Sequence, residues 1–394
     1  QRAAVEESRL GIPIIFGRDV IHGHHTVFPL PLAMASSFND ELVKTAYRDI
    51  ASEAALDHIH WTFTPMLDLS RDPRWGRCVE SPGEDPYLGG RMAAAMVRGI
   101  QGDNLSDDSS IAACAKHYIG YGASEGGRDY HHTDISEPSL HNYYLPAFNA
   151  AVKAGVQTVM NSFNEIGGQP TASSKRLLND ILRGELGFDG FVISDWGAIE
   201  QLKNHGVAEN DKQAAELALN AGLDMDMSDE CYIKHLPELI EEGKISQETL
   251  NNAVRNVLRV KLRLGLFEHP YAPEYETDEK EHGKHARELA SECMVLLKNN
   301  NNALPLKEDE RVVLAGPMVT IKESHLGTWT LDGKEKDVIS IAEAMKKAGG
   351  NNVIYHHAWL SDRQMISPWN VDTYVLCLGE SRYMSGEAQC LANI

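Results

Sequence analysis

The carboxylate with the clearest chemical setting in this sequence is Asp195. It follows the apolar run Phe191–Ile193 and Ser194, and the indole of Trp196 comes next. A carboxylate in that place is shielded on one side and reachable on the other, so it could attack an electrophilic carbon or hold a cation. The alternative is structural, because an aspartate there could cap the next helix through its first amides. Position alone leaves both roles open.

Lys116 and His117 stand in the same relation to the apolar run Ala112–Ala115. Adjacent strand residues point to opposite faces, so both side chains can enter one site only where the strand ends or bulges. One could hold a hydroxyl group of a ligand while the other serves the fold. A structural role for at least one of the two therefore stays open.

Residues 70–86 form a loop rich in Pro and Gly that contains three arginines and four acids. Ion pairs among them could lock the loop so that one guanidinium projects into a site with its fixed fork geometry. A salt-bridged loop with no role in chemistry is the alternative.

The run His22–His25 raises the question of a metal site. Two imidazoles two residues apart beyond a barrel strand can share one ion. With Lys116, His117 and Asp195 at later strand ends, they would assemble a metal-dependent amidohydrolase on a TIM barrel. Against this hypothesis, Asp19 and not a histidine leads the strand end, so a site without metal is favoured.

Two further carboxylates, Glu380 and Glu387, lie in a Gly-flanked loop near the end of the chain. The loop follows a predicted strand, and Glu387 could reach across to the first domain. A glutamate in such a loop is more often simply solvated, so Glu387 alone predicts no role.

These side chains need a scaffold, and the sequence indicates a parallel one. Between Ile12 and Asp226, short apolar runs alternate with amphipathic helical stretches, which is the pattern of βαβ units. One such stretch begins after Asn39 and another after Ser246, each behind a capping residue. The predicted strands are Ile12–Phe16, Trp61–Leu67, Ile111–Ile119, Thr158–Phe163, Phe191–Ser194 and Leu223–Met227.

Polar residues at the ends of these strands, such as Asp68, Asn161 and Asp226, favour a (β/α)₈ barrel over a doubly wound sheet. A barrel builds its site at the carboxyl ends of its strands. Only six strands are visible, and residues 3–10 read as the tail of a helix, so we expect the start of the barrel to be missing.

The periodicity stops after residue 266, which predicts a barrel domain over 1–266 and an acidic, Pro-bearing linker over 267–284. A second, smaller α/β unit follows over 285–394. Its predicted elements are helices at His285–Lys298 and Ile339–Lys347 and strands at Arg311–Ala315, Asn352–Tyr355 and Thr373–Leu378. No helix is evident between the last two strands, and the strands are too few to close a sheet.

Composition limits the classes of partner. The 57 acidic and 37 basic residues leave a formal charge of −20 on 394 residues, which argues against binding to nucleic acid or anionic lipid and favours a neutral polar substrate. No apolar run approaches the roughly 18 residues of a membrane span. The six cysteines are scattered without a C-x-x-C pair, so neither a zinc ribbon nor a dithiol centre is encoded.

Taken together, these segments resemble glycoside hydrolase family 3, and its bacterial β-glucosidases in particular. The matching motifs follow the family order across nearly the whole chain. They are Gly17–Gly23, Arg71–Arg77, Lys116–Tyr118, Val159–Asn164, Ile193–Gly197, Leu296–Asn299 and Leu304–Leu306. The resemblance implies an α/β fold with a (β/α)₈-type barrel, here incomplete, followed by a partial α/β sandwich domain that completes the active site.

The resemblance also implies roles for single residues. Asp195 would be the catalytic nucleophile, and Glu387, which fits the bacterial Ser-Gly-Glu pattern, would be the acid/base. The ligands of sugar hydroxyls would be Asp19, Arg77, Lys116 and His117, and the residues packing near the ring would be Met160 and Trp196. Arg77 and Lys116 near Asp195 would favour its ionised form.

Two departures from the family pattern stand near the catalytic carboxylates. Phe163 occupies a position where relatives often carry Tyr, so a hydroxyl contact with Asp195 would be lost. After Glu387, the run Gln389–Leu391 replaces the usual polar Ser-Arg continuation that would anchor the loop.

The predicted function is a retaining exo-β-glucosidase that removes terminal non-reducing β-D-glucosyl residues from β-glucosides or oligosaccharides. The reaction needs two carboxyl groups and neither cofactor nor metal. Because Asp19 could accept two hydroxyl groups at once, a hexose is preferred to a pentose. A β-xylosidase, a non-catalytic sugar-binding relative and the amidohydrolase are the alternatives. The resemblance implies a periplasmic or secreted bacterial protein, and a cytoplasmic location and a homodimer stay open.

Overall fold

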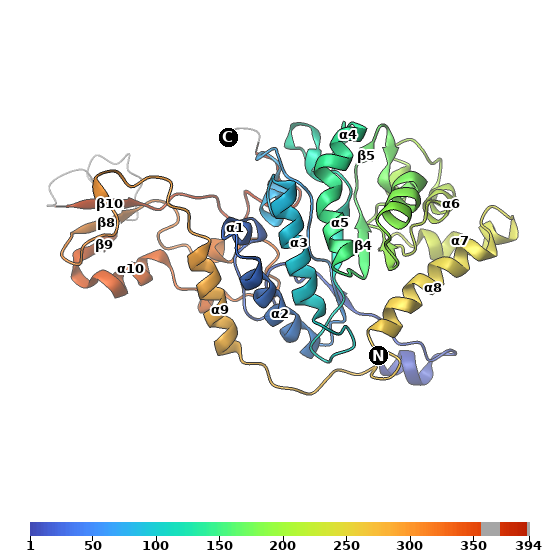
Figure 1. Cartoon of the computed structure of the whole chain (residues 1–394), viewed down its shortest axis with the longest axis horizontal. Helices are drawn as coiled ribbons and strands as arrows, with labels where there is room; N and C mark the ends of the chain where they lie inside the picture. The colour runs from blue at the N-terminus through green and yellow to red at the C-terminus, as the bar shows by residue number, and fades with distance from the viewer. Residues whose placement is uncertain (356–370, 392–394) are drawn as a thin grey trace.

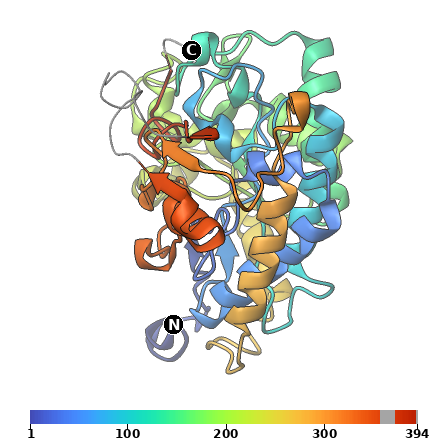
Figure 2. The ribbon, with the colours of Figure 1, turned by 90° about the vertical axis from the view of Figure 1, so that its left-hand side faces the viewer.

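Short parallel strands and longer helices make up the fold (Figures 1 and 2). The computed structural model describes residues 1–355 and 371–391. The α-helices are α1 (Pro31–Ser36), α2 (Asp40–Leu56), α3 (Pro86–Gln101), α4 (Glu137–Ser139), α5 (Leu145–Lys153), α6 (Asp211–Ala221), α7 (Cys231–Glu241), α8 (Gln247–Arg263), α9 (Glu279–Glu292) and α10 (Ile341–Gly349). The strands are β1 (Gly17–Arg18), β2 (Trp61–Thr62), β3 (Cys114–Tyr118), β4 (Thr158–Asn161), β5 (Glu165–Ile166), β6 (Gln169–Pro170), β7 (Phe191–Ile193), β8 (Val312–Ala315), β9 (Val353–Tyr355) and β10 (Thr373–Leu376).

The main strands of residues 1–266 lie beside one another in chain order. β1 pairs with β2, and β3, β4 and β7 form a sheet in that order, all in parallel. A bridge between Trp61 and Ala112 places β2 beside β3, and a bridge between Ile193 and Met225 extends the series past β7. Parallel strands in chain order are the arrangement of a barrel built from β/α units.

Two of the predicted strands are absent as strands from the structure, and the others are shorter than predicted. The strand expected at Ile12–Phe16 was wrong, because Pro13 has no amide hydrogen to donate and pairing starts at the Phe16 carbonyl, which accepts from the His60 amide at 2.9 Å. The segment Leu223–Met227 contributes a single bridge instead of a strand. The sequence pattern therefore predicted where most strands lie but predicted strands that are too long.

Side chains alternate across the sheet, as the two-residue period of a strand requires. One face carries an apolar cluster in which Cys114, Met160 and Ile193 surround Trp61. The residues next to them along the strands belong to the large cluster beneath the helices. Val260 of α8 joins the inner cluster, so this helix covers one end of the strand interior.

Helices α2, α3 and α5 stand side by side next to the strands (Figure 1). α2 begins where the sequence predicts, because the Asn39 side chain accepts a hydrogen bond from the Leu42 amide. Its buried face includes Val43 and Tyr47. Ser246 caps α8 in the same way. No helix among the described residues is long and apolar enough to cross a membrane.

Helix α9 begins within the segment predicted as a linker, so the predicted start of this helix was too late. Asp278 caps the helix at Glu279, and the acidic residues that suggested a loop instead favour the positive end of a helix. α9 packs on the first domain, where His282 Nδ1 lies 2.7 Å from Glu53 and Leu289 joins the large core cluster. Figure 1 shows an extended stretch that crosses from α8 to α9.

In the described residues, the second unit is a parallel sheet in the order β10-β8-β9, with α10 against β9. Ser340 and Glu343 form a capping box at the start of α10. The segment between β9 and β10, where the sequence predicts no helix, falls largely on residues 356–370 and lies outside the described residues. Loops at 326–333 and 386–391 run back from this unit to the first domain.

Candidate active site

The carboxyl ends of the parallel strands bring predicted site residues together. Asp19 follows β1, Lys116 and His117 lie near the end of β3, and Asp195 follows β7. Lys116 Nζ lies 3.4 Å from Asp19 Oδ1. His117 Nε2 lies 3.5 Å from Asp195 Oδ2. Residues from three separate strands therefore meet at one edge of the sheet.

Lys116 and His117 both enter this site, although they are neighbours in β3. The pairing of β3 with β4 shifts register between Ala115 and Tyr118. Such an irregularity breaks the strict alternation of side chains between the two faces of a strand. Both side chains are buried, and each lies beside a carboxylate. The strand irregularity that both side chains need in order to enter one site is therefore present in the structure.

Asp195 is fixed in a way that leaves one carboxylate oxygen free. Its amide donates to Asn161 Oδ1 at 3.2 Å, and the Trp196 amide donates to its Oδ1 at 2.7 Å. Its Oδ2 is buried and has no hydrogen-bond partner in the described part of the chain. The side chain accepts from the amide of the next residue and not from one deeper in a helix, so it does not act as a helix cap. A fixed carboxylate with one free oxygen suits nucleophilic attack.

Burial raises the pKa of Asp195 to about 7, although Arg77, Lys116 and the Trp196 amide act in the opposite direction. The sequence predicted that these two cations would favour the ionised form of this carboxylate. Their effect has the predicted direction, but the loss of water around a side chain that is 11% exposed outweighs it. The predicted effect of the two cations is therefore confirmed in direction, and burial opposes it.

His117 connects Asp195 to two further groups. Its Nδ1 lies 2.8 Å from Asp68 Oδ2, and its Nε2 lies 3.1 Å from Arg77 Nη2. Burial lowers the pKa of His117 well below its usual value, and Arg77 and Lys116 lower it further. A neutral ring with its proton on Nδ1 satisfies both contacts, because it donates to Asp68 and accepts from Arg77. Nε2 then has no proton to give to Asp195.

Arg77 is the guanidinium that the loop at 70–86 projects inward. It is 2% exposed, and it donates to both carboxylate oxygens of Glu80 at 2.9 and 3.1 Å. Its Nη1 lies 3.6 Å from Glu387 Oε1, and the ring of Tyr121 lies 5.6 Å from its central carbon. The predicted locking of this loop by ion pairs is present in the structure.

Glu387 reaches this site from the second unit. The Tyr130 hydroxyl donates to Glu387 Oε1 at 2.6 Å, the oxygen that also faces Arg77. Its side chain is 32% exposed, so solvent or a ligand can reach it. Glu380, the other carboxylate of this loop, is exposed.

Backbone hydrogen bonds anchor the loop that carries Glu387. The Gly386 amide donates to the Gly76 carbonyl at 2.7 Å, and the Gly76 amide donates to the Gln389 carbonyl at 3.1 Å. The Leu391 amide donates to the Arg74 carbonyl at 2.8 Å. Because main-chain groups make these bonds, the departure of residues 389–391 from the usual polar sequence does not prevent anchoring.

The sequence interpretation missed residues that hold these side chains in place. Asp68 follows a predicted strand, as Asp195 does, and that signal could have assigned it to the site. Asp129 accepts from the Ala388 amide at 2.7 Å, but no local pattern marks it. Trp329 comes from the second unit, where its side chain hydrogen-bonds to Glu80 and its ring lies 5.4 Å from Lys116 Nζ.

The histidines at 22, 24 and 25 do not join this site. Both ring nitrogens of His22 lie 2.7 Å from backbone carbonyl oxygens. His24 and His25 both contact Asp57. The amidohydrolase arrangement, which requires these histidines beside His117 and Asp195, is therefore not formed.

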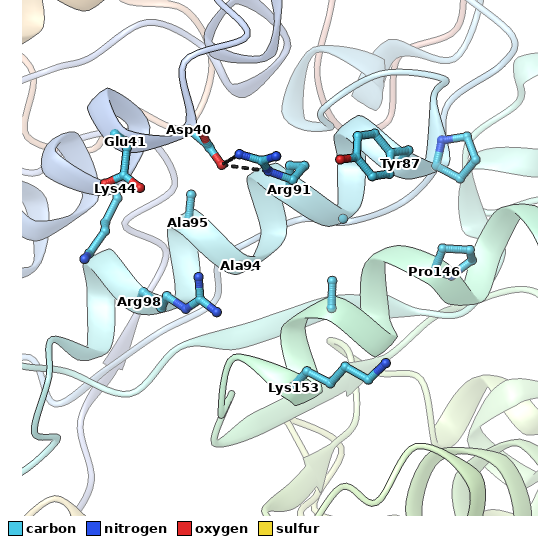
Figure 3. Close-up of a pocket in the computed structure, with 13 residues that line it drawn as sticks. Asp40, Glu41, Lys44, Tyr87, Arg91, Ala94, Ala95, Arg98, Pro146 and Lys153 are labelled. Carbon is cyan, nitrogen blue, oxygen red and sulfur yellow. Dashed lines mark hydrogen bonds and ion pairs between the residues drawn. The ribbon is translucent and has the colours of Figure 1, made fainter.

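A surface pocket lies apart from the strand ends (Figure 3). It is lined by residues of α2, α3 and α5, and Arg91 donates to Asp40 at its edge. None of the predicted site residues lines this pocket.

Comparison with known families accounts for both parts of the chain. The model of the Glycosyl hydrolase family 3 N terminal domain matches residues 1–260, and the model of the family's C-terminal domain matches residues 294–394. The chain belongs to glycosyl hydrolase family 3. The N-terminal part of a family 3 chain is a TIM-like barrel, in agreement with the strand order found here.

Several family 3 proteins are similar over most of this chain. A periplasmic beta-glucosidase from Salmonella typhimurium is 42% identical over 353 residues, which cover 87% of this chain and 46% of the relative. A beta-xylosidase from Formosa agariphila is 35% identical over 425 residues, which cover 98% of this chain and 59% of the relative. A crystal structure of a Listeria innocua beta-glucosidase with laminaribiose is 42% identical, with a TM-score of 0.94, and covers 100% of this chain and 56% of that one. The chain thus spans about half the length of these relatives.

The two residues predicted to pack near the sugar ring, Met160 and Trp196, lie in different surroundings. Met160 is 3% exposed and lies in the apolar cluster around Trp61, whereas Trp196 is 69% exposed. The Phe163 ring packs against Tyr130, with 5.0 Å between centroids. The hydroxyl group that Phe163 lacks is therefore present nearby on Tyr130, where it serves Glu387 and not Asp195.

Proposed function

We propose that this family 3 chain is a retaining exo-β-glucosidase that acts on terminal non-reducing β-D-glucosyl residues. The observation that carries the proposal is the free, buried Oδ2 of Asp195 within a cluster that also holds Glu387 through Arg77. A retaining glycosidase uses one carboxylate as nucleophile and a second carboxyl group as acid and then base. Asp195 and Glu387 supply this pair.

In the first step, Asp195 Oδ2 attacks the anomeric carbon while Glu387 gives its proton to the departing oxygen. A covalent glycosyl-aspartate results, and Glu387 then removes a proton from the water that hydrolyses it. The Tyr130 hydroxyl orients Glu387, and Asp68 holds the His117 ring in the tautomer whose Nε2 has no proton to give to Asp195. Because burial opposes ionisation of Asp195, we expect Arg77 and Lys116 to be needed for the attacking form.

Asp19 and Lys116 are proposed to bind hydroxyl groups remote from the bond that breaks. Asp19 is half-buried and keeps part of its carboxylate accessible beside Lys116. Such a carboxylate can accept two hydroxyl groups at once, which suits a hexose. A β-xylosidase is the second candidate, because a Formosa agariphila beta-xylosidase matches 98% of this chain at 35% identity.

We further propose that residues 1–266 form a (β/α)₈-type barrel and that the partial α/β sandwich predicted over 285–394 starts after α9, because α9 crosses the predicted boundary with the segment 267–284 and packs on the first domain. The family matches at 1–260 and 294–394 support this division. The name of the Salmonella typhimurium relative supports a periplasmic or secreted location. A homodimer is also proposed, and no cofactor is required for the reaction.

The test is a survey of nitrophenyl glycosides, with the product anomer followed by NMR and the intermediate trapped by a 2-fluoroglucoside. We expect turnover of the β-glucoside in excess of the β-xyloside, release of β-glucose, and a label on the peptide that contains Asp195. Preference for the xyloside would favour the second candidate. Labelling at Asp68 or Asp226, or glucose binding without turnover of any glycoside, would refute the proposed function.

A further inference from the structure

We propose that His24, His25 and Asp57 form a binding site for a divalent metal ion of the zinc class. His24 and His25 lie in the loop after β1, and Asp57 lies at the end of α2. One ligand atom from each residue, two imidazole nitrogens and one carboxylate oxygen, can be chosen so that all three lie within 4.8 Å of one another. Imidazole nitrogen and carboxylate oxygen are ligands that zinc accepts.

The two histidines present the same ring nitrogen to the same oxygen. His24 Nε2 lies 2.8 Å from Asp57 Oδ2, and His25 Nε2 lies 3.0 Å from it. Ligands at about 2.0–2.1 Å from a tetrahedral zinc are separated by about 3.3 Å, so small movements would admit an ion between these atoms. The rings stack with 4.6 Å between centroids, which holds them in parallel.

The opposite ring nitrogens face carboxylates. His24 Nδ1 lies 3.6 Å from Asp332 Oδ2, and His25 Nδ1 lies 3.4 Å from Glu279 Oε1. Histidines that bind a metal usually donate their other N–H to a carboxylate or carbonyl, which fixes the tautomer and increases the basicity of the ligand nitrogen. Both histidines have such a carboxylate.

Hydrogen bonding alone satisfies this arrangement poorly. If both neutral rings carry their protons on Nε2 to serve Asp57, each bare Nδ1 faces a carboxylate, which is repulsive. His24 Nδ1 is in fact buried and without a hydrogen-bond partner in the described structure. Protonating both rings would instead stack two like charges. An ion at the Nε2 atoms removes the conflict, because both protons then sit on Nδ1.

The charges around the cluster favour a cation. Asp57, Asp332 and Glu279 contribute carboxylates, and Arg18 offsets one of them through its 2.6 Å contact with Asp332. His24 is 2% exposed at its side chain, whereas His25 and Asp57 are 44% and 49% exposed. The site therefore has a rigid inner ligand and an open side through which an ion can enter.

This site differs from the proposed catalytic cluster in position and role. Its contacts reach the end of α2, the start of α9 and the 326–333 loop of the second unit, and not Asp195. Three protein ligands leave a fourth position for water. An ion there would tie the loop after β1 to the end of α2, with Asp332 and Glu279 behind the two imidazole ligands.

The experiment is calorimetric titration of the chelator-stripped 394-residue chain with zinc chloride. We expect one zinc ion per chain, with affinity lowered more than about 100-fold in His25→Gln and Asp57→Asn, and about 10–100-fold in Asp332→Asn. The matched control is His132→Gln. His132 is also 44% exposed and its ring lies beside that of a neighbouring histidine, but among the described residues its ion pair is with Glu125. The zinc affinity of His132→Gln should equal that of the parent.

Two results would overturn the proposal. The first is absence of zinc binding by the parent, or equal binding by the parent, His25→Gln and Asp57→Asn. The second is a thiolate charge-transfer band after substitution of cobalt for zinc, which would place the metal on a cysteine such as the exposed Cys390. Circular dichroism of each variant separates loss of a ligand from loss of the fold, because His25 and Asp57 are exposed enough to be replaced without opening the core.

Discussion

Replacing Asp195 with Asn should stabilise the protein above pH 7 and leave its stability nearly unchanged below pH 4. Burial raises the pKa of Asp195 from 3.8 to about 7 in the folded chain, so the folded state holds a proton that the unfolded state has lost between these values. The free energy of unfolding therefore falls as pH rises through this window. At about 1.4 kcal/mol for each pH unit, the full cost is about 4 kcal/mol.

Asn removes that cost without leaving a gap. Its side-chain oxygen can accept from the Trp196 amide, as Asp195 Oδ1 does, and its NH₂ group can face His117 Nε2 in place of the free Oδ2. Retaining these contacts is what allows the stability gain to appear.

Urea denaturation of the parent and of Asp195→Asn at pH 4, 6 and 8 measures the effect. The difference in unfolding free energy should grow from near zero to about 4 kcal/mol across the series. Asp189→Asn is the control, because Arg263 lowers the pKa of Asp189 and its loss should give a small change of opposite sign. A difference for Asp195→Asn that stays constant from pH 4 to pH 8 would refute the reasoning.

The remaining predictions concern turnover. Glu387→Ala should abolish hydrolysis of cellobiose but keep fast glycosylation by a dinitrophenyl glucoside. Azide should restore turnover of this variant and give β-glucosyl azide as the product; if azide restores turnover of Glu380→Ala instead, Glu380 is the acid/base. Asp19→Ala should lower kcat/KM for a β-glucoside more than for a β-xyloside, and an equal loss would contradict hexose selection by Asp19. Gly76→Ala should mimic Glu387→Ala on both substrates, because a Cβ at Gly76 would lie 2.5 Å from the Gly386 carbonyl oxygen; parental cellobiose activity would show that the loop docks otherwise.

The sequence predicted the parts of the fold and site that depend on local pattern. Asn39 and Ser246 cap helices that begin where expected, because capping needs only the side chain and the next few amides. Lys116 meets Asp19 and His117 meets Asp195 because these residues stand at the ends of parallel strands, and such strand ends lie at one edge of the sheet. Periodicity was sufficient for these inferences.

Other features depend on long-range packing, which no local pattern records. The register shift before Tyr118 arises from the pairing of β3 with β4, and it decides that Lys116 and His117 point into the same site. The raised pKa of Asp195 results from burial, whereas the charges near it were the part that could be inferred from the sequence. The start of α9 was misread because acidic residues suit both a linker and a helix N-terminus, and contacts with Glu53 decide between them.

The loop of Glu387 combines both kinds of information. The sequence could nominate Glu387 from its motif, but its position depends on how closely two backbones approach. Gly76 makes that approach feasible, since a Cβ there would lie 2.5 Å from the Gly386 carbonyl oxygen and 2.7 Å from the Gln389 carbonyl oxygen. Gly386 also has a φ of 97°, a conformation that glycine adopts without strain. The two glycines, one from each family 3 domain, therefore contribute in different ways: Gly76 leaves room for the second backbone, and Gly386 adopts the turn that brings the proposed acid/base to the cluster around Asp195.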